Sequence, residues 1–147
     1  MDQQLIVFTI AGEFYGIEVT RVREIQTYST PTLLPNTQPF VKGVINIRGD
    51  IVPVIDLYLR FDPQANPLYT DTTLMVTTKT SNGRMVAVIV DAIDTLAEYS
   101  SSKTIEFSTE VMFINRRYIE KIIAIDNRHV MVIDIDALFC AEEIINF

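Results

Sequence analysis

The chain has 147 residues, 48% of them apolar and 21% charged, a balance typical of a folded domain rather than a disordered segment. Nineteen acidic against twelve basic residues give a net charge of −7, which disfavours binding to nucleic acid or to an anionic membrane surface. A single cysteine, no signal-peptide pattern at the N-terminus and no apolar run of about 20 residues together predict a cytoplasmic protein that does not insert into the membrane.

The N-terminal region alternates strand-like segments with a turn. Residues 5–10 and 14–19 are rich in apolar side chains, and a turn-like sequence at residues 11–13 lies between them. This pattern predicts a β-hairpin. Residues 22–25 follow, and their short apolar pattern fits either a helical turn or a strand.

Prolines and turn residues then divide the chain. Pro31 and Pro35 predict an extended linker, because proline fixes its own φ and disfavours helix at the residue before it. A second hairpin is predicted over residues 41–55, with its turn at residues 48–50. Asp56 comes before a short apolar segment and is expected to be the N-cap of a helical turn.

A connector rich in turn residues, at 62–67, opens the second half. Strands are predicted over residues 72–78 and 84–90, because an Asn-Gly pair within residues 81–83 is a strong hairpin signal. From residue 97 to residue 117 the strand pattern weakens, and an irregular crossing is expected there.

One stretch of the chain occurs twice. Residues 44–57 resemble residues 122–135, and seven positions of the extended comparison are identical at a constant separation of 78 residues. A last hairpin is therefore predicted over residues 119–133. Asp134 is expected to cap a final short helix, as Asp56 does in the first copy.

These elements predict an all-β fold with short helices rather than an α/β sheet. The chain is expected to form a single domain over residues 1–147, built from two barrels of about five strands in the approximate halves 1–65 and 66–147. About 70 residues supply only a thin core, so the halves are expected to share a buried boundary, where a groove would form.

The residue types needed for catalysis or for a metal site are scarce. His129 is the only histidine and is expected at a strand edge, and Cys140 is expected to pack against neighbouring apolar residues. Asp56 and Asp134 hold equivalent capping positions, which accounts for them better than a paired-carboxylate mechanism does. We therefore expect no catalytic residue, no metal and no cofactor.

The most distinctive sequence lies in the second hairpin and the segment after it. Residues 43–49 (GVINIRG) and 51–57 (IVPVIDL) resemble the signature of the chemotaxis coupling protein family, CheW. The resemblance extends from Leu5 to about Glu143. Shorter matches follow the same order, over residues 15–17, 24–25, 34–35 and 86–91.

This resemblance implies a fold of two interlocked five-stranded SH3-like β-barrels in one CheW-like domain. It also implies a non-enzymatic adaptor that couples chemoreceptor cytoplasmic tips to the regulatory domain of the histidine kinase CheA, in arrays beneath the inner membrane. In the family, a helical hairpin at the receptor tip lies in an apolar groove between the barrels. Such recognition combines apolar contacts with a few charges that set the register.

Seven residues match functional positions of the family. Gly43 matches a position linked to kinase binding. The alternatives remain open: the aliphatic residues fit an ordinary core, the charged ones a solvated surface, and the glycine a strand bulge. The positions matched to receptor binding are Val22, Glu24, Arg48, Leu74, Val86 and Ile93.

The chain also departs from the family, with Ala87, Ala92 and Lys121 where many relatives carry glycine. Lys121 stands where the first repeat has Gly43, so an altered kinase-binding face is expected. Two other functions stay open: an adaptor of another motility or signalling pathway, and a free-standing SH3-like interaction module. An enzyme using the acidic residues is the remaining alternative.

Overall fold

The computed structural model describes residues 3–35, 37–99, 104–105 and 118–139. The helical segments there are short: the 3-10 turn η1 (Val19–Arg21) and the helices α1 (Leu57–Phe61) and α2 (Ile135–Leu138). The strands are β1 (Gln3–Ile10), β2 (Glu13–Glu18), β3 (Val22–Thr27), β4 (Val41–Ile47), β5 (Asp50–Asp56), β6 (Leu74–Lys79), β7 (Met85–Val90), β8 (Ala92–Tyr99), β9 (Thr104–Ile105), β10 (Ile119–Ile125) and β11 (Arg128–Ile133). The predicted all-β fold with short helices is confirmed.

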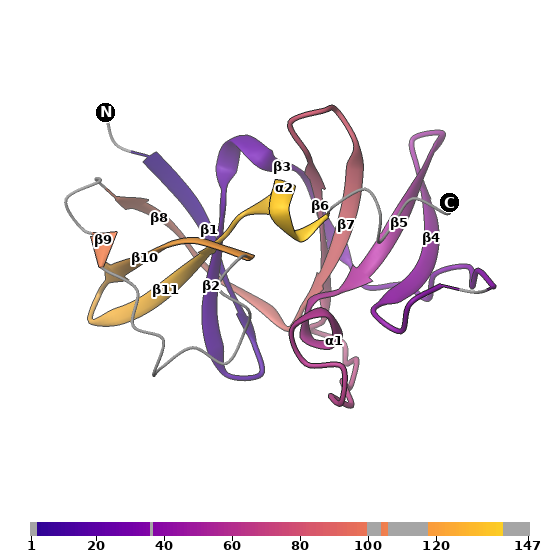
Figure 1. The fold of residues 1–147 in the computed structure, drawn as a ribbon, viewed down its shortest axis with the longest axis horizontal. Helices are drawn as coiled ribbons and strands as arrows, with labels where there is room; N and C mark the ends of the chain where they lie inside the picture. The colour runs from indigo at the N-terminus through magenta and orange to yellow at the C-terminus, as the bar shows by residue number, and fades with distance from the viewer. Residues whose placement is uncertain (1–2, 36, 100–103, 106–117, 140–147) are drawn as a thin grey trace.

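The strands form two sheets that lie side by side (Figure 1). One has six strands in the order β8-β1-β2-β11-β10-β9, because the two-residue β9 extends the expected five. The other has five, in the order β3-β6-β7-β5-β4. The pairings between described strands leave β8 and β9 at the edges of the first sheet and β3 and β4 at the edges of the second, so neither barrel is closed by hydrogen bonds.

The two sheets exchange one strand each. The β1–β2 hairpin is followed by β3, which pairs with β6 of the other sheet, and the β6–β7 hairpin is followed by β8, which pairs back with β1. Residues 22–25, whose sequence fits either a helical turn or a strand, therefore form part of a strand. Each sheet contains strands from both halves of the chain, which is the interlocked arrangement that the family resemblance implies.

The sequence repeat corresponds to a structural repeat. The β4–β5 and β10–β11 hairpins each have an irregular register near the start of the first strand, after Val41 and after Ile119. The backbone N–H groups of Asp56 and Asp134 donate to the carbonyls of Phe40 (2.8 Å) and Tyr118 (2.9 Å). These partners are again 78 residues apart, so the repeat extends beyond the identical positions.

Even the turns of the two hairpins match, although their sequences differ. Arg48 and Gly49 have φ of 53° and 93°, and Asp126 and Asn127 have φ of 49° and 63°. Two consecutive residues with positive φ are typical of the type I′ turn, whose twist suits a two-residue hairpin. Glycine, asparagine and aspartate tolerate this region readily, whereas Arg48 adopts it at some cost in free energy.

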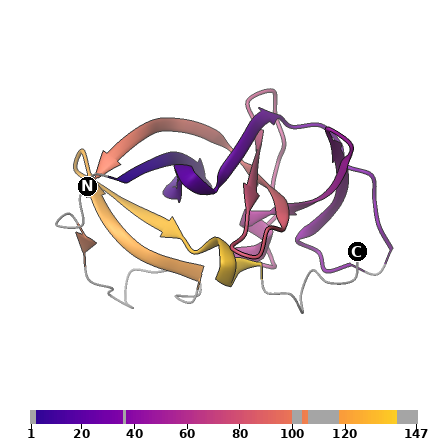
Figure 2. The same cartoon turned by 90° about the horizontal axis from the view of Figure 1, so that it is seen from above.

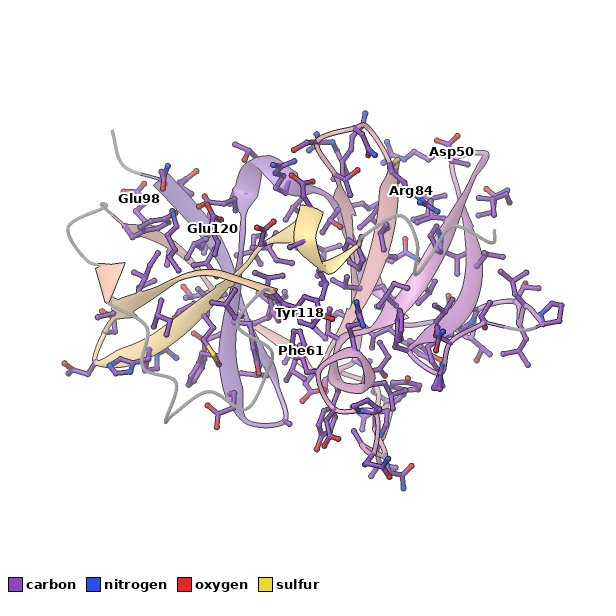
Figure 3. All side chains as sticks on the ribbon, in the orientation of Figure 1. Asp50, Phe61, Arg84, Glu98, Tyr118 and Glu120 are labelled. Atoms are coloured by element: carbon purple, nitrogen blue, oxygen red, sulfur yellow. The ribbon has the colours of Figure 1, made fainter. Side chains whose placement is uncertain are left out.

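Among the residues that the structure describes, three apolar clusters make up the core. A central cluster takes side chains from both sheets, among them Phe8, Tyr15, Val76 and Val88, and a smaller cluster belongs to each sheet alone. The rings of Phe61 and Tyr118 lie 6.4 Å apart near the junction of the sheets (Figure 3). In the described parts of the chain, none of the helices is long and apolar enough to cross a bilayer.

Candidate protein-interaction site

Part of the predicted site lies on one face of the five-stranded sheet. Val22 is opposite Thr78 on β6, Ile25 is opposite Val76, and Leu74 is opposite Thr27. Directly opposed residues on neighbouring strands point to the same side of a sheet. Val22 and Leu74 pack partly buried against the central cluster, while Ile25 is 40% exposed. We call Val22, Ile25 and Leu74 the β3 row.

A second apolar row lies on the exchanged strand of the other sheet. Ile93 is opposite Phe8 on β1 and packs partly buried against the central cluster, and Leu96 is opposite Ile6 and is 59% exposed. We call Ile93 and Leu96 the β8 row. Strands β3 and β8 run along the same side of the molecule, opposite β10, β11 and α2 (Figure 2).

The site prediction omits Ile25 and Leu96, although the sequence contains a signal for them. The spacing of Val22 and Ile25 returns in Ile93 and Leu96, each pair three residues apart. Both omitted residues are large, apolar and exposed in the structure. Exposed apolar side chains next to a core cluster are typical of interaction surfaces.

Val86 has a different environment from the other predicted apolar residues. Its side chain is 0% exposed and belongs to the central cluster, opposite Thr78. Thr78 lies between Val86 and Val22, so Val86 supports the β3 row from within the core. The structure thus places Val22, Leu74 and Ile93 at the surface of the central cluster and Val86 inside it.

The two predicted charged residues lie together, but on the other face of the five-stranded sheet. Glu24 is opposite Thr77, whose own partner Ala87 belongs to the cluster of that sheet alone. The carboxylate of Glu24 lies 3.7 Å from the guanidinium of Arg48. The predicted receptor-binding set therefore divides into apolar rows on one face and an ion pair on the other.

Gly43 permits a close approach of two backbone segments. Its φ is +140°, and a Cβ atom there would lie 2.2 Å from the carbonyl oxygen of Thr32. Thr32 and Val44 exchange two backbone hydrogen bonds of 2.9 Å, which hold the linker against β4. A side chain would break this contact, so the backbone accounts for the glycine, and the predicted linker is in part paired.

Lys121 occupies the equivalent place in the second repeat without such a constraint, since its φ is not positive. Its ammonium lies 3.6 Å from the carboxylate of Glu18 and 5.0 Å from the ring centre of Tyr99. The Tyr99 hydroxyl donates to the same carboxylate. The departure from the family pattern therefore places a paired cation on the six-stranded sheet. Ala87 is fully buried, and Ala92 begins β8.

The acidic pair that suggests catalysis has a structural role in each repeat. The carboxylate of Asp56 accepts hydrogen bonds from the N–H of Leu59 at 3.0 Å and from the Tyr69 hydroxyl. The carboxylate of Asp134 accepts from the N–H of Ala137 at 3.1 Å. Both are N-caps, as predicted.

His129 and Cys140 are the remaining sequence-based candidates for catalysis or metal binding. His129 is exposed and lies opposite Ala124 on β10. Cys140 lies outside the described residues. Within residues 3–35, 37–99, 104–105 and 118–139, no three His, Cys, Asp or Glu side chains gather as a metal site would require.

Comparison with known proteins matches nearly the whole chain. The model of the CheW-like domain family matches residues 4–143. The chemotaxis protein CheW of Klebsiella aerogenes is 30% identical over 143 residues, which cover 97% of this chain and 85% of that protein. The chemotaxis protein CheW of Bacillus subtilis is 30% identical over 145 residues, covering 95% of this chain and 88% of that protein.

The fold is similar to a solved structure of the same family. The crystal structure of the scaffolding protein TtCheW from Thermoanaerobacter tengcongensis matches with a TM-score of 0.84 and 29% identity, over 95% of this chain and 88% of that chain. The family match, the identities and the structural likeness all extend across both sheets. This chain belongs to the CheW-like domain family.

Proposed function

We propose that this chain is a non-enzymatic adaptor that couples chemoreceptors to the histidine kinase CheA in bacterial chemotaxis. The observation that carries the proposal is the match to the CheW-like family across residues 4–143. The exposed apolar side chains beside the central cluster support it, because an adaptor needs surfaces for its partners.

The receptor tip is proposed to lie on the β3 row and the β8 row. A helical hairpin presents apolar side chains at intervals of three and four residues, which suits a surface with apolar residues from two sheets. Val22, Leu74 and Ile93 would form the base of this contact, because they pack partly buried against the central cluster. Val86 would act from beneath, by supporting Val22.

Arg48 is proposed to contact a carboxylate of the receptor. Its side chain is 83% exposed. Within the described residues it forms an ion pair with Glu24, at the rather long distance of 3.7 Å. A planar guanidinium can donate to a second carboxylate in a bidentate arrangement. Glu24 would then orient the arginine rather than contact the partner itself.

Gly43 is proposed to act on kinase binding through the backbone. The residue is buried, so a partner gains little by touching it directly. Its role would be to let the Thr32 segment pair with β4 and so shape the surface that carries Leu33, which is 80% exposed. The kinase regulatory domain is the proposed partner of that surface.

The remaining features of the proposal concern organisation and place. We infer that residues 1–147 form one CheW-like domain with two subdomains, in the approximate halves 1–65 and 66–147. The exchange of β3 and β8 between the sheets supports one folding unit rather than two. The protein would work in the cytoplasm, at receptor arrays beneath the inner membrane.

Calorimetry tests the proposal, with the purified chain titrated separately with a soluble receptor signalling tip and with the CheA regulatory domain. Binding to both supports a coupling adaptor. Binding to neither, by a protein that melts cooperatively, would contradict it and favour a free-standing SH3-like module. Binding only to the receptor and kinase of another motility system would reassign the adaptor to that pathway.

A further inference from the structure

A basic hollow lies where η1, the start of β3 and the β6–β7 turn meet. Its volume is about 460 Å³, and its lining includes Arg21, Arg23, Lys79, Thr80 and Ser81. None of the described residues that line it is acidic. This composition contrasts with the whole chain, which has a net charge of −7.

Hydrogen bonds fix the two guanidinium groups of the hollow. Arg23 Nη1 donates to the carbonyl oxygens of Thr20 (2.8 Å) and Val22 (3.3 Å). Arg21 Nη2 donates to Ser81 Oγ at 2.9 Å and lies 3.3 Å from Asp136 Oδ2. Cations held in place by the protein lose less entropy when they bind an anion than free side chains do.

Asp136 neutralises only one of the three cations. Burial alone would raise the pKa of Asp136, but hydrogen bonds from Ser81 and the charge of Arg21 outweigh it, so the pKa lies below its ordinary value and the carboxylate stays ionised at neutral pH. Asp136 pairs with Arg21. Among the described residues, Arg23 and Lys79 form no ion pair, so two positive charges in the hollow lack a carboxylate partner.

We propose that this basic hollow binds carboxylate side chains of an acidic segment in a partner protein. Guanidinium groups match carboxylates in bidentate geometry, and the ammonium of Lys79 adds a third positive charge. The acidic remainder of the surface repels such a segment, so its binding is confined to the hollow. A long polyanion such as nucleic acid would extend onto that repelling surface, which makes it the poorer occupant.

The hollow adjoins the β3 row, because Arg21 and Arg23 flank Val22 in the chain. A partner segment that places an apolar residue on Val22 can therefore reach the hollow with a neighbouring acidic one. The inference goes beyond the proposed function, since it concerns the charge of a partner segment and holds whichever protein carries that segment.

An NMR titration of the ¹⁵N-labelled full chain with an octaglutamate peptide tests this inference. At about 50 mM salt, chemical-shift changes are expected for the amides of residues 20–23 and 79–83. These changes should become smaller as the salt concentration rises, because salt screens the charges. Arg23→Gln/Lys79→Gln should raise the dissociation constant at least about fivefold. The matched control Gln64→Glu/Asn66→Asp lowers the net charge by the same two units at exposed positions elsewhere. This control should change the dissociation constant less than about twofold.

Two results would overturn the inference. One is an unchanged dissociation constant in Arg23→Gln/Lys79→Gln, or shifts that map away from the hollow. The other is tighter binding of a single-stranded DNA octanucleotide than of octaglutamate at the same amides, which would point to nucleic acid instead. Octaglutamate is neither receptor nor kinase, so a failure of the proposed function leaves this test unaffected.

Discussion

Glu24 and Arg48 connect the two edges of the five-stranded sheet. Glu24 is on the edge strand β3, and Arg48 lies in the turn after the other edge strand, β4, with 3.7 Å between carboxylate and guanidinium. The sheet therefore curls enough to bring its edges within reach of two side chains. A surface ion pair of this kind contributes only about 0–1 kcal/mol to stability. We propose that the pair serves to orient the exposed Arg48 rather than to stabilise the fold.

We predict that Arg48→Glu weakens binding of the receptor tip at least about tenfold. The substitution replaces an exposed cation with a carboxylate, which would repel the proposed receptor carboxylate. The melting temperature should fall by only a few degrees, since the lost ion pair is weak. Calorimetry with the receptor tip and a thermal melt check the two parts of this prediction.

The charge swap Glu24→Arg/Arg48→Glu provides the control. It restores the ion pair and should restore stability, but it should leave receptor binding weak because the exposed position still carries a carboxylate. Full recovery of binding in the double variant would show that the pair itself, rather than Arg48, is what the partner needs.

In the apolar rows, Val22→Asp and Ile25→Asp are each predicted to weaken receptor binding by about 2 kcal/mol, roughly 30-fold. A carboxylate there would be desolvated by the partner helix, at a cost in binding free energy. Ile25 is more exposed than Val22, so its variant separates lost binding from lost packing. Leu33→Asp is the matched control, since Leu33 is exposed and apolar but lies beside β4; equal losses in all three variants would contradict the assignment.

Much of the fold could be predicted from the sequence, because hairpin signals and caps act locally. The cap at Asp56 is where it is predicted, and the two turns lie within the predicted ranges, at residues 11–12 of the predicted 11–13 and at residues 48–49 of the predicted 48–50. The exchange of β3 and β8 between the sheets could not be predicted, since consecutive strands usually pair with each other and nothing local marks a strand that leaves its hairpin. The family resemblance supplied that feature.

The site could be predicted less well, for a geometric reason. Val22 and Glu24 would share a face in a regular strand, but the register shifts between them, so they point to opposite faces. No side-chain pattern marks this bulge at Arg23. Exposure is equally hard to predict: Val22 and Val86 are both valines in strands, yet Val86 is fully buried in the central cluster and Val22 is only partly buried against it.

Replacing Gly43 with alanine should destabilise the protein by about 3 kcal/mol, because the new Cβ would meet a backbone oxygen and φ would stay in a region that L-residues avoid. Gly49→Ala is the control: its φ is +93°, yet nothing lies within 4 Å of the added Cβ, so only the conformational cost of about 1 kcal/mol remains. Chemical denaturation of both variants measures the difference.

Kinase binding by the same variants separates two roles for Gly43. If Gly43→Ala keeps the stability of the wild type but loses the kinase, the glycine contacts the partner directly and the backbone role proposed above is wrong. Loss of both stability and kinase binding, with altered amide signals at Thr32, agrees with the backbone role.

The two helix caps should differ in strength. Asp56→Ala is predicted to cost about 3 kcal/mol, because it removes a cap and leaves the Tyr69 hydroxyl without its buried acceptor. Asp134→Ala removes the capping bond from the N–H of Ala137 and should cost about 1 kcal/mol. Equal losses in urea denaturation would show that the Tyr69 contact contributes nothing.

Stability should fall at alkaline pH. Burial, with the charge of Glu13, raises the pKa of Tyr15 from 10.0 to about 12. A group whose pKa is higher in the folded state stabilises fully below its unfolded pKa, and this contribution is lost as pH rises from 10 to 12. Burial also raises the pKa of Tyr69 and of Tyr99, each with a carboxylate partner, in the same direction. The free energy of unfolding should therefore decline over this range, and less steeply in Tyr15→Phe.

Co-sedimentation with receptor-containing membranes tests coupling most directly. CheA is mixed with such membranes in the presence of the wild-type chain, in the presence of Ile25→Asp, or without any chain. We predict that CheA sediments with the membranes when the wild-type chain is present, and remains in the supernatant in the other two mixtures. Equal sedimentation of CheA in all three would contradict the account, because the kinase would then need no adaptor of this kind.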